Sequence, residues 1–84
     1  MAPEKETQKT IQARLNILQK SLVSEENSVQ YYQTLLDNTA ADTEENIGAR
    51  RMYLDLQIEE KKHVKTIQDL IQHWEEQLKN LKNG

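Results

Sequence analysis

Apolar residues recur along the first half of the chain at alternating intervals of four and three residues. Only one charged residue interrupts this series, whose positions are Ile11, Leu15, Leu18, Leu22, Glu25, Val29, Tyr32 and Leu36. Such spacing lines one face of a helix and is typical of helices that pack lengthwise against another helix. With two Gly and one Pro in 84 residues, little in the chain would break helices. The sequence therefore predicts an all-α protein.

The segment DNTAAD, residues 37–42, interrupts this pattern with residues that favour helix ends. Asp42, followed three residues later by Glu45, is similar to a capping box that would open a second helix. Pro3 suits the first turn of the first helix. We therefore expect one domain, residues 1–84, forming an antiparallel hairpin with helices over about 4–40 and about 43–82.

The second helix is predicted to carry a matching seam. Its positions are Tyr53, Leu56, Glu60, His63, Ile67, Leu70 and Trp74, followed by Leu78 or Leu81. A flanking stripe of Val64, Ile71 and Leu78 is expected to face away from this seam and to mark a further interface. Two helices alone cannot bury apolar faces of this width. The hairpin is therefore expected to pair with a second copy as a four-helix bundle, and to associate beyond the dimer.

Composition excludes several classes of protein. A net charge of -3 argues against a nucleic-acid-binding protein, which is usually basic. No apolar run is long enough to cross a bilayer, and the first twenty residues lack the apolar core of a signal peptide, so we expect a cytoplasmic protein that binds no membrane. The absence of Cys excludes thiolate zinc sites and iron–sulfur clusters.

Three ionisable residues, Glu25, Glu60 and His63, fall on the otherwise apolar seams. If the first helix reaches about residue 40, Glu25 and Glu60 lie within one turn of the same level, whereas an end at Asp37 would separate them by more than a turn. Unpaired carboxylates are costly to bury. Two hairpins about a twofold axis would bring together four Glu and two His, whose four negative charges balance two divalent cations.

This inventory is the ligand set of ferritin-like di-iron proteins: one Glu from each of two helices and Glu-x-x-His from each of the other two. Oxygen and imidazole ligands suit iron or manganese better than the closed tetrahedral sites of zinc. We therefore predict a metal site at Glu25, Glu60 and His63, with two ions per dimer interface, iron being favoured and manganese left open.

Two segments resemble a known family. EENSVQYY (25–32) is similar to the first ligand helix of rubrerythrin-type ferritin-like proteins, and LDLQIEEKKHVKTIQDL (54–70) resembles their second. A single hairpin of this size is most similar to the encapsulated ferritins, whose metal site forms between two subunits. The resemblance implies a ferritin-like four-helix bundle with Glu25, Glu60 and His63 as iron ligands and Tyr32 as a phenol beside them.

The same resemblance implies a ferroxidase, which oxidises Fe(II) to Fe(III) for iron storage or detoxification. It also implies a ring of homodimers and an encapsulin shell as partner and location. The sequence departs from these proteins in three respects. Encapsulated ferritins carry acidic residues of an outer metal site at the positions of Ser24 and Asn27. In this chain Glu26 or Glu59 would have to supply those carboxylates. No encapsulin-targeting tail follows LKNLKNG, and no Cys is present for the second iron domain of rubrerythrins.

Another interpretation remains open. EEKKH is ordinary composition for a solvated helix, and a buried Glu/His layer can fix the register or oligomeric state of helices, as a seam Asn does in coiled coils. The chain would then be a non-enzymatic assembly or adaptor domain. A site holding two manganese ions or a mixed pair would use the same ligands.

Overall fold

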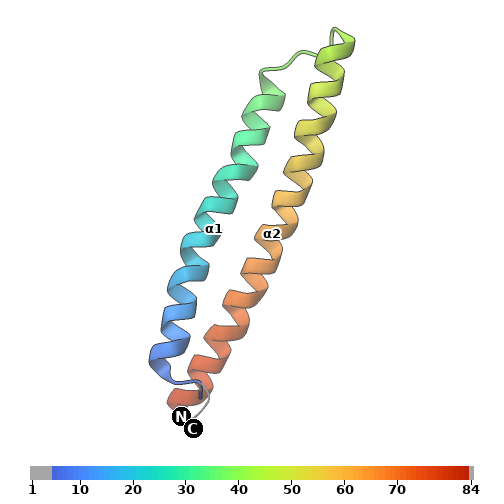
Figure 1. Cartoon of the computed structure of the whole chain (residues 1–84). Coiled ribbons are helices and arrows are strands. Elements are labelled where there is room, and N and C mark those ends of the chain that lie inside the picture. Colours follow the sequence, from blue (N-terminus) through green and yellow to red (C-terminus); the bar gives the residue numbers. More distant parts are fainter. Residues whose placement is uncertain (1–4, 84) are drawn as a thin grey trace.

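The computed structural model describes residues 5–83, which form two long antiparallel helices joined by a short loop (Figure 1). The helices are α1, Gln8–Asp37, and α2, Glu44–Asn83. They lie side by side as a rod 61 Å long, with the start of α1 and the end of α2 at the same end. The predicted all-α hairpin is confirmed.

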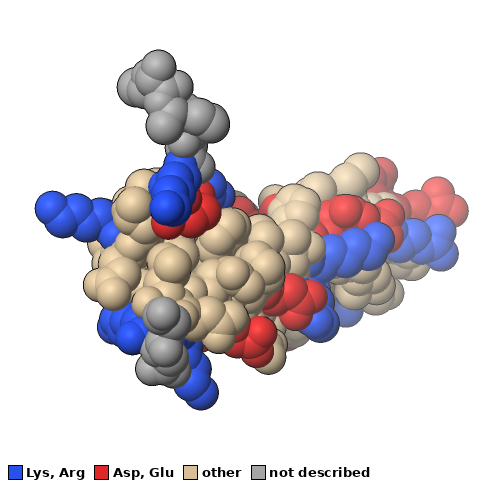
Figure 2. Space-filling view, turned by 90° about the horizontal axis from the view of Figure 1, so that it is seen from below, with Lys and Arg blue, Asp and Glu red and all other residues tan. Residues whose placement is uncertain are grey.

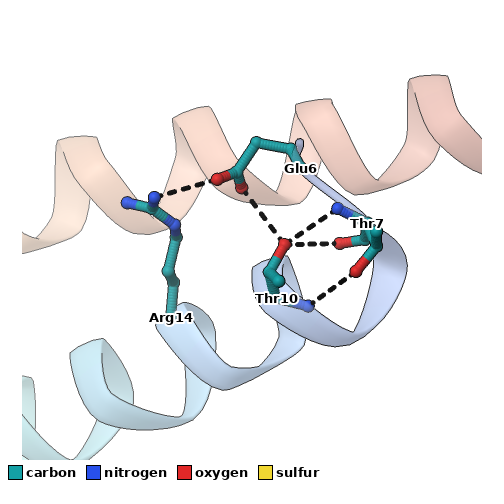
Figure 3. Close-up of polar contacts among 4 residues, drawn as sticks. All are labelled: Glu6, Thr7, Thr10 and Arg14. Atoms are coloured by element: carbon teal, nitrogen blue, oxygen red, sulfur yellow. Dashed lines mark hydrogen bonds and ion pairs between the residues drawn. The ribbon is translucent and has the colours of Figure 1, made fainter. Parts of the chain in front are cut away.

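The start of α1 differs from the prediction because Thr7 caps the helix. Thr7 is extended, with φ -124° and ψ 170°, and its hydroxyl accepts a hydrogen bond from the Thr10 backbone N–H at 3.2 Å. The Thr10 hydroxyl in turn accepts from the Thr7 N–H at 2.8 Å, completing a capping box (Figure 3). The helix therefore begins at Gln8 rather than near residue 4, and the predicted role of Pro3 lies outside the described residues.

The helix ends at the loop also differ from the prediction. α1 stops at Asp37 instead of about residue 40, since Asn38 and Thr39 turn back to donate to the carbonyls of Thr34 and Leu36. α2 is capped by Thr43, whose hydroxyl accepts from the Asn46 N–H at 3.0 Å. The predicted Asp42–Glu45 capping box is wrong: Asp42 accepts from the Asn46 side-chain amide at 2.9 Å.

The guanidinium group of Arg50 links α2 to the end of α1 and to the loop. Arg50 of α2 donates from Nη1 to the carbonyl oxygens of Leu36 and Thr39, both at 2.5 Å. These bonds satisfy acceptors that the end of α1 leaves without helical partners.

We expect Arg50→Met, which keeps much of the apolar stem, to lower the free energy of unfolding by about 1.5–3 kcal/mol through loss of these charged hydrogen bonds. Urea denaturation measures this change. The neighbouring Arg51 is exposed and provides the control, because Arg51→Met should change stability by no more than about 0.5 kcal/mol. Equal losses in both variants would contradict the role of Arg50.

The seam of α1 is as predicted. Ile11, Leu15 and Leu36 are buried, and the other five predicted positions are half-buried.

At three positions of α2, the residue that packs between the helices is the one that follows the predicted residue. Gln57 is 3% exposed, and Val64 and Ile71 are half-buried, whereas Leu56 and Leu70 are 38% and 41% exposed. The stripe that includes Val64 and Ile71 therefore faces α1 and does not face away from it. The reason is that α2 carries two adjacent apolar stripes, and a single partner helix covers only one. The uncovered side of the hairpin, marked by Leu56, His63 and Leu70, is called the open face below.

Positively and negatively charged side chains are mixed on the part of the surface shown in Figure 2. Viewed from the end of the rod at which α1 begins, Lys and Arg side chains project in several directions and acidic side chains lie among them (Figure 2). Within the described part of the chain, neither helix contains a stretch apolar and long enough to traverse a lipid bilayer.

Candidate metal centre

The three ionisable seam residues meet between the helices. One ligand atom from each of Glu25, Glu60 and His63 lies within 4.8 Å of the other two. His63 Nδ1 is 3.5 Å from Glu25 Oε2 and 3.8 Å from Glu60 Oε1. α1 supplies one carboxylate, and α2 supplies the other carboxylate and the imidazole from successive turns of one side. The structure thus brings together all three residues that the sequence predicted as ligands.

The cluster forms even though α1 ends at Asp37. Glu25 precedes that end by twelve residues, whereas Glu60 follows the start of α2 by sixteen. The difference of four residues corresponds to about 6 Å along a helix axis. The start of α2 extends beyond the end of α1, and the loop runs outward to reach it (Figure 1). This offset compensates for the difference in length, so Glu25 and Glu60 lie close together even though the first helix ends at Asp37.

The cluster is not satisfied by its own contacts. Glu25 Oε2 is buried and forms no hydrogen bond with the described residues, and His63 Nδ1, at 3.5 Å, would form an ion pair with it only if the imidazole were protonated. The nearby Ser28 hydroxyl donates to the Ser24 carbonyl instead. The adjacent Glu25 carboxylate, to which a protonated Glu60 can donate a hydrogen bond, raises the pKa of Glu60, and burial raises it further. Two carboxylates therefore share a site in which their negative charges oppose each other.

The three side chains of the cluster differ in exposure. The side chains of Glu25 and Glu60 are 29% and 24% exposed, while that of His63 is 57% exposed. The carboxylates thus form the inner wall between the helices, and the imidazole lies on the open face beside Leu56 and Leu70. Two oxygen donors and one nitrogen donor are suitable ligands for iron or manganese, and three donors leave coordination positions free for ligands from elsewhere.

The remaining predicted site residues lie outside the cluster. Tyr32 is half-buried, its ring packs edge-on against Tyr31 at 5.4 Å, and seven residues, or about 10 Å of helix, separate it from Glu25. Its role beside the metal stays a prediction. Glu26 lines a hollow with Val29 and Lys61, and Glu59 pairs with Lys62 at 3.1 Å, so neither extends the ligand set within this chain.

Sequence reasoning missed Gln57. This residue is buried, and its amide donates to the Val29 carbonyl at 3.2 Å and to Gln33 Oε1 at 3.1 Å. Its spacing of four from Tyr53 and three from Glu60 fits the seam, but the neighbouring Leu56 fits equally well and is more apolar. That ambiguity hid a buried polar residue one turn from the cluster.

Comparison with known proteins gives no assignment: no family model matches the sequence, and no curated protein or solved structure shows a significant match.

Proposed function

We propose that this protein is a ferroxidase that oxidises Fe(II) to Fe(III) at a site shared by two hairpins. Its ligands are Glu25, Glu60 and His63 of each copy. The observation that carries the proposal is the buried Glu25 oxygen, which lacks a hydrogen bond and lies within a three-donor cluster. A cation supplies the partner that this oxygen lacks, because buried charges are normally paired or coordinate metals.

The contrast with Gln57 supports a metal site over a layer that only sets register. The Gln57 amide donates two hydrogen bonds across the helix pair and is a satisfied polar layer. The Glu25–Glu60–His63 layer, one turn away, contains a carboxylate oxygen without a hydrogen bond and a pair of like charges. A layer that served specificity alone would be expected to satisfy its polar groups, as the Gln57 layer does.

Pairing through the open face completes the site. Leu56 and Leu70 flank His63 and are exposed on a single hairpin, so a second copy that covers them also brings its own ligands to the cluster. Each hairpin contributes two carboxylates, enough to balance one divalent ion, and the dimer would hold two. When dioxygen or peroxide oxidises both ions to Fe(III), the pair would carry six positive charges, of which the four carboxylates would offset four.

The physiological setting belongs to the same proposal. Oxidation of Fe(II) serves iron detoxification or storage in the cytoplasm, and storage requires an enclosed volume, which a flat assembly of hairpins does not provide. An encapsulin shell would supply that volume. Manganese uses the same donors, and metal analysis of the protein as purified distinguishes the two metals.

Adding Fe(II) in air and following the near-ultraviolet absorbance of Fe(III) tests the proposal. With the parent, about one Fe(II) per chain should be oxidised, at a rate above that in buffer alone. Glu25→Gln should reduce this rate by about tenfold or more. Glu26→Gln, which changes the adjacent exposed carboxylate, is the matched control and should behave like the parent. Oxidation by the parent at the buffer rate would favour the non-enzymatic assembly domain.

A further inference from the structure

Gln57 joins the two helices close to the level of the metal cluster. On α2 it lies one turn before Glu60, and on α1 it contacts the carbonyl of Val29, one turn after Glu25. Its second acceptor, Gln33 Oε1, is held from the other side, because the Gln33 side-chain amide donates to Asp37 at 2.9 Å. The amide of Gln57 is therefore satisfied by two acceptors at fixed heights on α1.

We infer that Gln57 is a positioning residue that sets the axial register of α1 against α2, and thereby places Glu25 opposite Glu60 and His63. The part of this inference that concerns metal rests on the proposed function. The part that concerns register rests on the hydrogen bonds alone.

The size of a register shift shows why this matters. A slip of one helical turn moves one helix by about 5.4 Å along the other. All three ligand atoms lie within 4.8 Å of one another, so a slip of this size would separate Glu25 from the two ligands on α2. It would also carry the Gln57 amide away from Val29 and Gln33 and leave it unpaired in the seam, which is strongly unfavourable. An apolar residue at position 57 would carry no such penalty.

Other polar contacts between the helices lie farther from the cluster than Gln57 does. Arg14 stacks on the Trp74 ring at 4.4 Å and forms an ion pair with Glu6 at 2.9 Å (Figure 3). Arg14 lies eleven residues from Glu25 on α1, and Trp74 lies eleven residues from His63 on α2. Stacking on a broad ring also depends less on axial position than a hydrogen bond does. At the other end, Arg50 of α2 bonds to the Leu36 carbonyl of α1 and to the Thr39 carbonyl of the loop, and it restrains the helices ten or eleven residues from the cluster.

Spin-label distances measure the register without any metal. The chain has no Cys, so Lys20→Cys and Asp55→Cys introduce two unique labelling positions, both exposed. Labelled protein, diluted with unlabelled protein in chelator, should give one narrow distance distribution. In the Gln57→Met background, which retains side-chain size but removes the amide, the distribution should broaden or shift by about 5 Å. Gln72→Met makes the same change at an exposed position and should match the parent.

Anaerobic calorimetric titration of the unlabelled proteins with Fe(II) measures the consequence for the site. Gln57→Met should weaken binding by about tenfold or more while circular dichroism shows the parent helix content. An unchanged distance distribution would overturn the register role, and a changed distribution with parent-like affinity would overturn the positioning role. If Gln57→Met does not fold, Gln57→Leu carries the same test. A parent that binds no Fe(II) refutes the proposed function, while the distances still decide the register.

Discussion

Glu60→Gln and His63→Ala are each expected to abolish stoichiometric iron binding and to lower the rate of Fe(II) oxidation by about tenfold or more. Each change removes one of the two donors that α2 contributes to a cluster of three. Bound iron is measured after desalting, and oxidation by the ferric absorbance. Glu59→Gln and His73→Ala replace exposed residues of the same types on α2 and should retain both properties. A Glu60 or His63 variant that oxidised Fe(II) like the parent would show that the site is wrongly assigned.

The same Glu60→Gln variant should be more stable than the parent when metal is absent. The pKa of Glu60 is raised, so its ionisation at neutral pH opposes folding, and a neutral amide removes that opposition. We expect a gain of a few tenths to about 1 kcal/mol, which raises the melting temperature in chelator by about 2–6 °C. Glu59→Gln should show no such gain. A lower melting temperature for Glu60→Gln would mean that the carboxylate contributes to folding, as the adaptor interpretation requires.

If the proposed metal-bound dimer forms, removal of metal is expected to dissociate it and to lower the melting temperature of the parent by about 10–20 °C. Without cations, four carboxylates would meet at one interface and repel one another. A ligand present at a hundred times its dissociation constant stabilises the native state by about 2.7 kcal/mol, and in a chain of this size each kcal/mol shifts melting by about 4–8 °C. Light scattering and thermal melts with and without chelator measure both effects.

Glu60→Gln is the control for this experiment, because a protein that binds no metal should not respond to chelator. Unchanged mass and melting of the parent would contradict the coupling of metal to assembly. The same light scattering tests the predicted ring of dimers, for which a clean dimer mass would be the opposing result. The outward stripe of Val64, Ile71 and Leu78 that favoured a ring is wrong, because all three residues are half-buried, although Leu81 in the last turns of α2 is 43% exposed.

The fold and the composition of the site could be predicted because they depend on regular spacing. The seam of α1 repeats at intervals of four and three, so all eight of its positions were identified, including Glu25. The Glu-x-x-His spacing places Glu60 and His63 on one side of α2 whatever the register of the hairpin. These features belong to a single helix and require no knowledge of its partner.

What the sequence could not provide depends on how the two helices meet. α2 has adjacent apolar stripes, and the choice of Gln57 over Leu56 for the seam follows from acceptors on α1, Val29 and Gln33, that no spacing rule includes. The helix ends were misplaced by one to four residues where Thr7 and Thr43 cap in place of the expected residues. The level of Glu25 relative to Glu60 then depended on a loop geometry that the sequence left undetermined.

The separation of the Gln57 layer from the Glu/His layer has a consequence for altering this protein. Because the amide layer already joins the helices, and because the adjacent Glu25 carboxylate raises the pKa of Glu60, we expect the helices to stay paired when the three ligands are replaced. We therefore expect other donor sets at positions 25, 60 and 63 to be accepted with little change to the backbone around them. Under the proposed function, the hairpin is a cysteine-free scaffold in which the identity of the bound metal could be changed by replacing these three side chains.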